Sequence, residues 1–106
     1  EKALADAGLP ARLMVDCSHA NSSKDPGLQP LVMENLVNQI IEGNRSIVSV
    51  MIESNIGWGN QKLGNDPAAL DYGVSITDGC IDWETTERVL RDAASRLSQP
   101  LLARTG

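Results

Sequence analysis

The sequence predicts an α/β protein with parallel strands, and three observations support this fold class. Short apolar segments rich in Val and Ile alternate with segments in which apolar residues recur at helical spacing. Polar side chains gather directly after the apolar segments, as they do where buried strands end at a functional loop. The resulting order is strand, helix, strand, long loop, strand and helix, which is typical of a parallel sheet with connecting helices.

The start of the chain predicts a short helix followed by a strand. Residues 1–7 have a helix-like composition, and this run stops at Gly8 and Pro10, which are both helix breakers. Residues 12–17 form a short apolar run that is followed at once by polar residues. We therefore expect the first strand here, buried on both faces and ending at a polar loop.

The next segment changes to helical period and then returns to a strand. Asp25 followed by proline supplies a helix start signal, and Gly43 supplies a stop. The buried stripe of this helix is expected to contain Leu31, Val32, Leu36, Ile40 and Ile41. Residues 46–53 are nearly all apolar until they end in a carboxylate, and they predict a second buried strand.

A long glycine-rich loop and a third strand follow. Residues 54–74 contain four glycines and several Asn and Asp residues, so only a turn around residues 68–70 is expected there. A connection of about 20 residues without regular structure is uncommon and usually functional, and an idle surface loop is the alternative. Residues 73–78 then predict a short third strand.

The chain is expected to end in an amphipathic helix and a frayed tail. Asp82 is a helix-capping residue at the start of this helix. The inward face is expected to contain Trp83, Val89, Leu90, Ala93, Ala94 and Leu97. Residues 98–106 are expected to be a frayed end.

The composition excludes several classes of protein. Nine basic and fourteen acidic residues give a net charge of -5, and no Lys/Arg cluster is present, so we expect no nucleic-acid partner. No apolar run approaches the roughly 20 residues that span a bilayer, so we expect a soluble, cytoplasmic protein without a membrane partner. Cys17 and Cys80 are expected to be buried free thiols rather than a disulfide.

The chain is expected to be a piece of a longer protein. It begins at Glu1, without an initiator Met, inside a helix-like run. Three parallel strands by themselves would leave open edges and uncovered apolar faces, because parallel sheets are normally shielded on both sides. The missing partners would then lie outside the 106 residues.

Three candidate metal ligands stand at equivalent places in the predicted strands. His19 follows the first strand, Glu53 ends the second and Asp78 ends the third. Because parallel strands about 4.8 Å apart end at one edge, their terminal side chains can converge on one ion. One imidazole and two carboxylates suit Mn²⁺, Fe²⁺, Co²⁺ or Zn²⁺. The alternatives are a structural histidine, a solvated strand end and a turn-forming aspartate.

Four sequence blocks together resemble one enzyme family. They are DCSHANSSK at residues 16–24, MIESN at residues 51–55, GNQ at residues 59–61 and SITDGC at residues 75–80. In this order they resemble the C-terminal part of the metal-dependent 3-deoxy-D-arabino-heptulosonate 7-phosphate (DAHP) synthases, which open the shikimate pathway of aromatic amino-acid biosynthesis. An unrelated short metal-binding α/β protein is the alternative.

The resemblance implies both a fold and a reaction. Residues 1–106 would be the last three strands and flanking helices of a single (β/α)8 catalytic TIM barrel, with the remainder of the barrel absent. The intact enzyme, a transferase of the aldolase type, would condense phosphoenolpyruvate with erythrose 4-phosphate to give DAHP and phosphate. We expect it to be a homo-oligomer.

The resemblance also implies the site residues. In the family the His, Glu and Asp of these blocks bind the divalent metal, and His19, Glu53 and Asp78 occupy those positions here. His19 is also the candidate catalytic residue, through a hydrogen bond to substrate. The fourth family ligand is a cysteine that lies upstream, and neither Cys17 nor Cys80 matches it; a local thiolate site is a minor alternative.

Three further residues are candidates for substrate binding, namely Asn21, Ser22 and Lys24. Their alternatives are hydrogen bonds within the loop for Asn21 and Ser22, and a solvated surface position for Lys24. The phosphate-binding Arg and Lys residues that the resemblance implies lie upstream of this chain, so the isolated chain is expected to be inactive. A non-catalytic module that associates with itself or completes a barrel is the competing interpretation.

Overall fold

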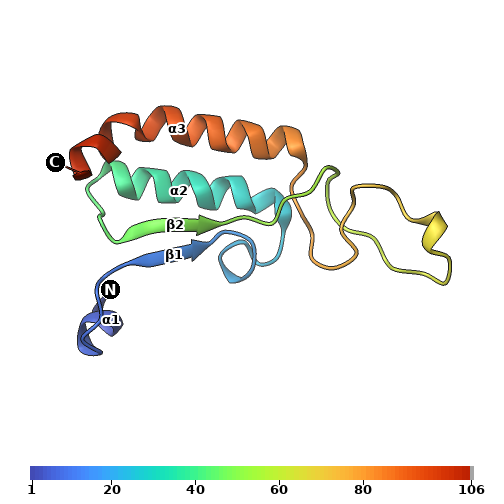
Figure 1. The fold of residues 1–106 in the computed structure, drawn as a ribbon, viewed down its shortest axis with the longest axis horizontal. Coiled ribbons are helices and arrows are strands. Elements are labelled where there is room, and N and C mark those ends of the chain that lie inside the picture. The colour runs from blue at the N-terminus through green and yellow to red at the C-terminus, as the bar shows by residue number, and fades with distance from the viewer. Residues whose placement is uncertain (106) are drawn as a thin grey trace.

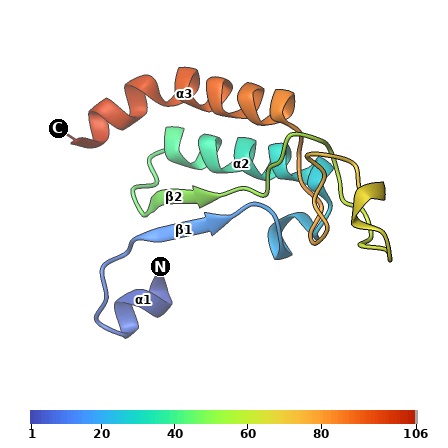
Figure 2. The ribbon, with the colours of Figure 1, turned by 45° about the vertical axis from the view of Figure 1, so that its right-hand side comes forward.

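A computed structural model describes residues 1–105, which form a two-stranded sheet, two long helices and an extended loop. In both ribbon views the helix α2 lies between the sheet and the helix α3, and residues 54–80 extend away from these layers (Figures 1 and 2). The elements are α1 (Lys2–Asp6), β1 (Leu13–Asp16), α2 (Gln29–Ile41), β2 (Ile47–Met51) and α3 (Trp83–Thr105). Single turns of 3-10 helix span Ala20–Ser22, Pro26–Leu28 and Pro67–Ala69.

The strands β1 and β2 pair in parallel, as the sequence predicts. Val15 is opposite Val50 and Asp16 is opposite Met51, with one register shift between Leu13 and Met14. The helix α2 connects the two strands along the chain, which is the βαβ arrangement that parallel pairing requires. Both strands therefore end at the same edge of the sheet, next to the loop that follows β1.

The prediction of a third strand at residues 73–78 is wrong, because no strand forms between β2 and α3 in the described residues. Residues 73–80 make only isolated bridges to the preceding loop, such as Asn60 to Ser75 and Gly59 to Cys80. The Ile76 side chain is 48% exposed, so it contributes little to a core. The local pattern of Val and Ile favours a strand, but a strand also needs a neighbouring strand to pair with. Here the backbone of this segment forms hydrogen bonds with the preceding loop and not with β2.

The core lies between α2, α3 and the sheet. Its buried members are Cys17, Met33, Leu36, Val37, Ile47, Val89, Ala93 and Leu97. The buried residues of α3 are Thr86, Val89, Ala93 and Leu97, which are three or four positions apart and form one stripe. The prediction that Trp83, Leu90 and Ala94 face inward is therefore wrong. The helix α3 packs against one neighbouring helix, α2, and this contact covers a narrower stripe than a sheet face would. Leu31 and Ile41 on α2 are exposed as well, so their predicted place in the buried stripe is also wrong.

The cysteine prediction is confirmed. Cys17 and Cys80 are both free and buried.

The predicted frayed tail is also wrong within the described residues, since α3 continues to residue 105 and includes Pro100. The Arg104 side chain donates hydrogen bonds to the carbonyl oxygens of Asn44 (2.6 Å) and Ile47 (2.9 Å). These contacts join the last turn of α3 to the start of β2, and nothing in the local sequence predicts them. Gly106 lies outside the described residues.

Asp82 caps α3, as predicted. Its Oδ1 accepts a hydrogen bond from the backbone N–H of Thr85 at 2.9 Å. Hydrogen bonds from the side chain and backbone of Thr85 hold the pKa of Asp82 below its ordinary value. The ionised carboxylate is therefore the form that stabilises the helix start.

This cap predicts a pH-dependent stability difference. Because the folded-state pKa of Asp82 is lowered, its contribution is fully present above the unfolded pKa of about 3.9 and is lost as pH falls through the folded pKa. We expect the difference in melting temperature between the wild-type chain and Asp82→Ala to be largest above about pH 4 and to shrink below it. Asp82→Asn keeps a capping oxygen that does not titrate, so its difference from Asp82→Ala should change little with pH.

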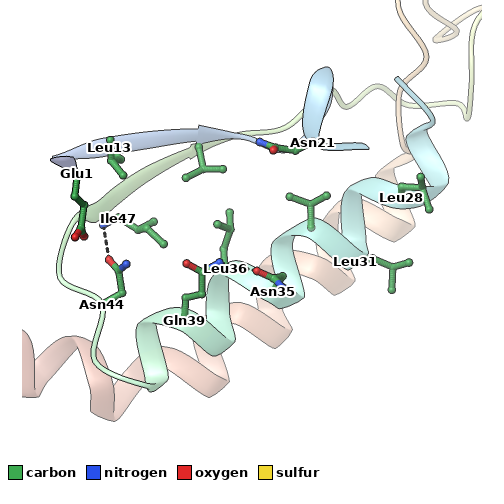
Figure 3. Close-up of a pocket in the computed structure, with 12 residues that line it drawn as sticks. Glu1, Leu13, Asn21, Leu28, Leu31, Asn35, Leu36, Gln39, Asn44 and Ile47 are labelled. Carbon is green, nitrogen blue, oxygen red and sulfur yellow. Dashed lines mark hydrogen bonds between the residues drawn. The ribbon is translucent and has the colours of Figure 1, made fainter. Parts of the chain in front are cut away.

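Large apolar surfaces stay uncovered. Met14 and Val48 on the strands are 64% and 56% exposed. A groove of about 640 Å³ runs between β1 and α2, and Figure 3 shows Leu13, Leu31 and Leu36 around it. The radius of gyration is 16.7 Å, compared with about 13 Å for a compact domain of this size. Among residues 1–105, no helix has both the length and the apolar character needed to cross a bilayer.

Candidate metal centre

The side chains of His19, Glu53 and Asp78 meet at the edge where β1 and β2 end. His19 Nε2 lies 3.3 Å from Glu53 Oε1 and 3.2 Å from Asp78 Oδ2. One ligand atom from each residue falls within 4.8 Å of the other two. The convergence expected from the sequence is therefore observed, and metal ligation by these residues stays a prediction.

The three residues reach this position from different kinds of backbone. His19 lies in the loop directly after β1, and Glu53 is two residues beyond the end of β2. Asp78 comes from the irregular segment that precedes α3, and not from a strand end as predicted. Parallel pairing of β1 with β2 brings the first two residues together, whereas the placement of Asp78 depends on the long loop.

The GNQ block at residues 59–61 holds this long loop in place. Asn60 Nδ2 donates to the carbonyl oxygen of Thr77 at 2.9 Å, immediately before Asp78. Gln61 Nε2 donates to the carbonyl of Val74 at 3.0 Å, and Gly59 exchanges two backbone hydrogen bonds with Cys80. The block thus fixes the backbone on both sides of Asp78, a contribution that spacing in the sequence does not reveal.

Asp16 orients the imidazole and was missed as a site residue in the sequence. Its Oδ2 lies 2.6 Å from His19 Nδ1, and its Oδ1 accepts hydrogen bonds from the N–H and the hydroxyl of Ser18 at 2.8 and 2.7 Å. The carboxylate is thus held by the turn and accepts from Nδ1, which leaves Nε2 facing Glu53 and Asp78. The signal was available, because a carboxylate at a strand end stands three residues before the histidine.

Hydrogen bonds between these groups shift their pKa values. The hydrogen bond from His19, followed by those from Ser18, holds the pKa of Asp16 well below its usual range. The hydrogen bond to Asp16, followed by that to Asp78, raises the pKa of His19. Both shifts favour an ionised carboxylate that keeps a proton on Nδ1.

The donor set fits a divalent cation. It offers one imidazole nitrogen and two carboxylate oxygens, and the second ring nitrogen is already engaged by a carboxylate, as is usual for metal-binding histidines. Within the described part of the chain, neither cysteine joins this group. Burial, the largest cause, raises the pKa of both Cys17 and Cys80, which disfavours the thiolate site considered as an alternative.

The candidate substrate-binding residues differ in what they contact. Ser22 is buried, and its hydroxyl donates to the carbonyl of Ser18 at 2.6 Å, so it is committed to the loop. Asn21 Nδ2 donates to the carbonyl of Asp16 at 2.7 Å, which also favours the alternative of a hydrogen bond within the loop. Lys24 is exposed, with a backbone φ of 63°. Substrate contacts from Asn21, Ser22 and Lys24 stay predictions.

A prediction follows for Asp16. Asp16→Ala is expected to weaken Mn²⁺ binding by about tenfold, because removing a carboxylate that orients a metal-bound histidine typically costs 10- to 100-fold in affinity. Asp16→Asn keeps an acceptor for Nδ1–H and should lose less. A titration of each variant with Mn²⁺ measures this difference, and equal affinities for the wild type and Asp16→Ala would contradict it.

The fold and the cluster together define a mixed α/β protein with a candidate divalent-metal centre. The chain belongs to the DAHP synthetase I family, which it matches over residues 2–91.

Similar proteins are enzymes named phospho-2-dehydro-3-deoxyheptonate aldolase. The Tyr-sensitive enzyme of Escherichia coli (strain K12) is 52% identical over 104 residues, which is 98% of this chain and 29% of that protein. The tyrosine-inhibited enzyme of Candida albicans is 51% identical over 96 residues, which is 88% of this chain and 25% of that protein. The chain thus spans less than a third of the length of these relatives.

A solved structure gives the same match in three dimensions. The phospho-2-dehydro-3-deoxyheptonate aldolase from Francisella tularensis SCHU S4 superposes with a TM-score of 0.80 at 40% identity. The superposition covers 90% of this chain and 27% of that structure.

Proposed function

We propose that residues 1–106 are the C-terminal segment of a (β/α)8 catalytic domain in a DAHP synthase. The complete enzyme condenses phosphoenolpyruvate with erythrose 4-phosphate and releases DAHP and phosphate. The observation that carries this proposal is the convergence of His19, Glu53 and Asp78 in a chain that belongs to this family. Its cytoplasmic location and homo-oligomeric state stay predictions.

The architecture supports a barrel segment. Two parallel strands joined by α2 form one βαβ unit, and such units are the repeating element of the barrel. In the described residues β1 and β2 pair only with each other, so the outer side of each strand is open, and so is the groove beside β1. This is expected where neighbouring strands and helices of a barrel would pack. The cluster lies at the C-terminal ends of the strands, where barrel enzymes build their active sites.

The residues of the centre have separate tasks. His19, Glu53 and Asp78 would hold Mn²⁺, Fe²⁺, Co²⁺ or Zn²⁺. Such an ion supplies Lewis acidity toward the aldehyde oxygen of erythrose 4-phosphate, or activates a water molecule. With an ion bound, Asp16 would keep the proton of the neutral imidazole on Nδ1, so that Nε2 could donate its lone pair to the ion.

Charge at the mouth of the site matters for two phosphorylated substrates. Glu53 and Asp78 add negative charge, so the phosphate groups need cations that this chain largely lacks. Lys24 is an exposed cation five residues after His19 and is the candidate from this chain. Further Arg and Lys residues must come from the remainder of the barrel.

A hybrid enzyme tests the proposal. This chain replaces the matched 104-residue segment of the Escherichia coli enzyme, with which it is 52% identical. We expect the hybrid to form DAHP and release one phosphate per turnover when a divalent ion is supplied, and to lose activity with a chelator. A folded hybrid that binds a divalent ion yet makes no product would count against the proposed reaction.

A second candidate function is a non-catalytic module that associates with itself or completes a barrel. The exposed Met14 and Val48 side chains and the open groove favour association, because apolar surface of this kind is rarely left uncovered in monomers. Sedimentation and turnover measurements, on the chain by itself and mixed with the N-terminal part of the Escherichia coli enzyme, distinguish the two candidate functions. Recovery of turnover in the mixture supports the catalytic proposal, whereas a stable complex without turnover supports the module.

A further inference from the structure

The Gln29 side chain makes an unusual pair of contacts with the backbone of one candidate ligand. Gln29 is the first residue of α2 and is only 2% exposed. Its Oε1 accepts a hydrogen bond from the N–H of Glu53 at 2.9 Å, and its Nε2 donates to the carbonyl oxygen of Glu53 at 3.1 Å. Both ends of a buried amide are therefore used on a single residue 24 positions away.

These contacts replace the pairing that a strand would provide. The strand β2 ends at Met51, so the backbone of Glu53 lies beyond the sheet. A buried N–H without a partner is costly, and the side-chain amide of Gln29 has the same donor and acceptor as a backbone peptide group. Gln29 thus acts at Glu53 as one peptide unit of a neighbouring strand.

The backbone of Glu53 also contacts the segment that carries Asp78. The carbonyl oxygen of Glu53 accepts a second hydrogen bond, from the N–H of Ile81 at 3.1 Å, three residues after Asp78. On the other side, Gln29 directly follows the loop that carries His19. The backbone of Glu53 is therefore tied to both segments that supply the other two members of the cluster.

We infer that Gln29 is a positioning residue of the metal centre: its amide fixes the backbone of Glu53 so that the carboxylate faces His19 Nε2 and Asp78. The inference rests on the proposed metal-binding function of the cluster. Glu53 has a long, flexible side chain, so the position of its carboxylate depends on the position of its Cα. A shift of about 1 Å at that Cα would move Oε1 out of the 3.3 Å approach to His19.

Gln29→Met tests this inference in the 106-residue chain. Methionine keeps the length and the buried volume of glutamine but removes both hydrogen bonds. We expect the affinity for Mn²⁺ to fall by about tenfold. Paramagnetic broadening of NMR signals during a titration with Mn²⁺ measures this affinity. The Glu53 amide should exchange its hydrogen at least about tenfold faster, because its acceptor is gone.

The matched control is Gln39→Met. It makes the same change on the same helix, at an exposed residue whose Nε2 donates to Asn35. Mn²⁺ affinity and Glu53 amide exchange should both equal those of the wild type. A purely structural role for Gln29 would lower the melting temperature of Gln29→Met but leave the Mn²⁺ affinity of the folded fraction unchanged, and that result overturns the inference.

A third variant separates this inference from the proposed function. If His19→Ala abolishes Mn²⁺ broadening while Gln29→Met binds as the wild type does, the centre stands and the inference fails. If His19→Ala also binds as the wild type does, the proposed centre itself fails, and the inference falls with it.

Gln29→Asn covers the case in which Gln29→Met does not fold. It keeps a polar amide in the buried position but is one methylene too short to reach both atoms of Glu53. Weakened Mn²⁺ binding in folded Gln29→Asn supports the inference. Wild-type affinity in that variant overturns it.

Discussion

His19→Ala is expected to lower kcat/KM of the hybrid enzyme by about a thousandfold or more. The imidazole supplies the one nitrogen among the three candidate ligand atoms. Lewis-acid stabilisation of a transition state is worth several kcal/mol, and a loss of about 4 kcal/mol corresponds to a factor of about a thousand. Mn²⁺ binding should weaken in parallel. Product formation and calorimetry with Mn²⁺ measure the two effects separately.

The control for this variant is Gln99→Ala, an exposed change near the end of α3, away from both the cluster and the groove beside β1. It should keep the turnover and the metal affinity of the unsubstituted hybrid. His19 is the only histidine in the chain, so no other imidazole of this segment can replace it. Identical Mn²⁺ isotherms for the unsubstituted hybrid and for His19→Ala would remove His19 from the centre.

Leu97→Ala is expected to destabilise the 106-residue chain by about 2–4 kcal/mol. Leu97 is 7% exposed and packs in the core cluster between α2 and α3. Removing its side chain leaves a cavity at the contact that holds α3 against α2, and the loss includes both the transfer and the cavity contributions. Urea unfolding followed by circular dichroism measures the change in free energy.

Leu90→Ala is the matched control on the same helix. Leu90 is 48% exposed, so its removal should change the free energy of unfolding by less than about 1 kcal/mol. The comparison tests whether α3 buries a single narrow stripe, as the structure indicates, or the wider face predicted from the sequence. Equal losses for the two variants would favour the wider face.

The loop after β1 illustrates how far sequence reasoning reached at the site. The position of His19 directly after an apolar run, and that of Glu53 after the next one, placed two members of the cluster at neighbouring strand ends. Asp16 was not singled out, although a carboxylate at a strand end three residues before His19 was a signal that the sequence offered. Gln29 was not singled out because its contact with Glu53, 24 residues away, leaves no periodic signal in the sequence. Their roles depend on turn geometry and on how α2 packs against β2.

The segment before α3 shows where local pattern misleads. Residues 73–78 alternate apolar and polar side chains, yet Ser75 forms a bridge with Asn60 and the segment does not extend the sheet. Asp78 still reaches the cluster, because the side chain of Asn60 and the Gly59–Cys80 pair fix the backbone around it. The expected convergence was right for Asp78 although the expected strand was wrong.

The sequence by itself determined the α/β class, the parallel pair β1 and β2, the two long helices and the family. These features follow from short-range periodicity, capping residues and contiguous motifs, which are all local properties of the chain. The sequence also placed Leu36, Val89, Ala93 and Leu97 on the buried faces of the helices correctly. Only the tertiary structure decided how wide each buried face is, how the long loop holds Asp78 and which side chains orient His19 and Glu53. Those features depend on hydrogen bonds and packing between segments far apart in the chain, and local pattern does not encode such contacts.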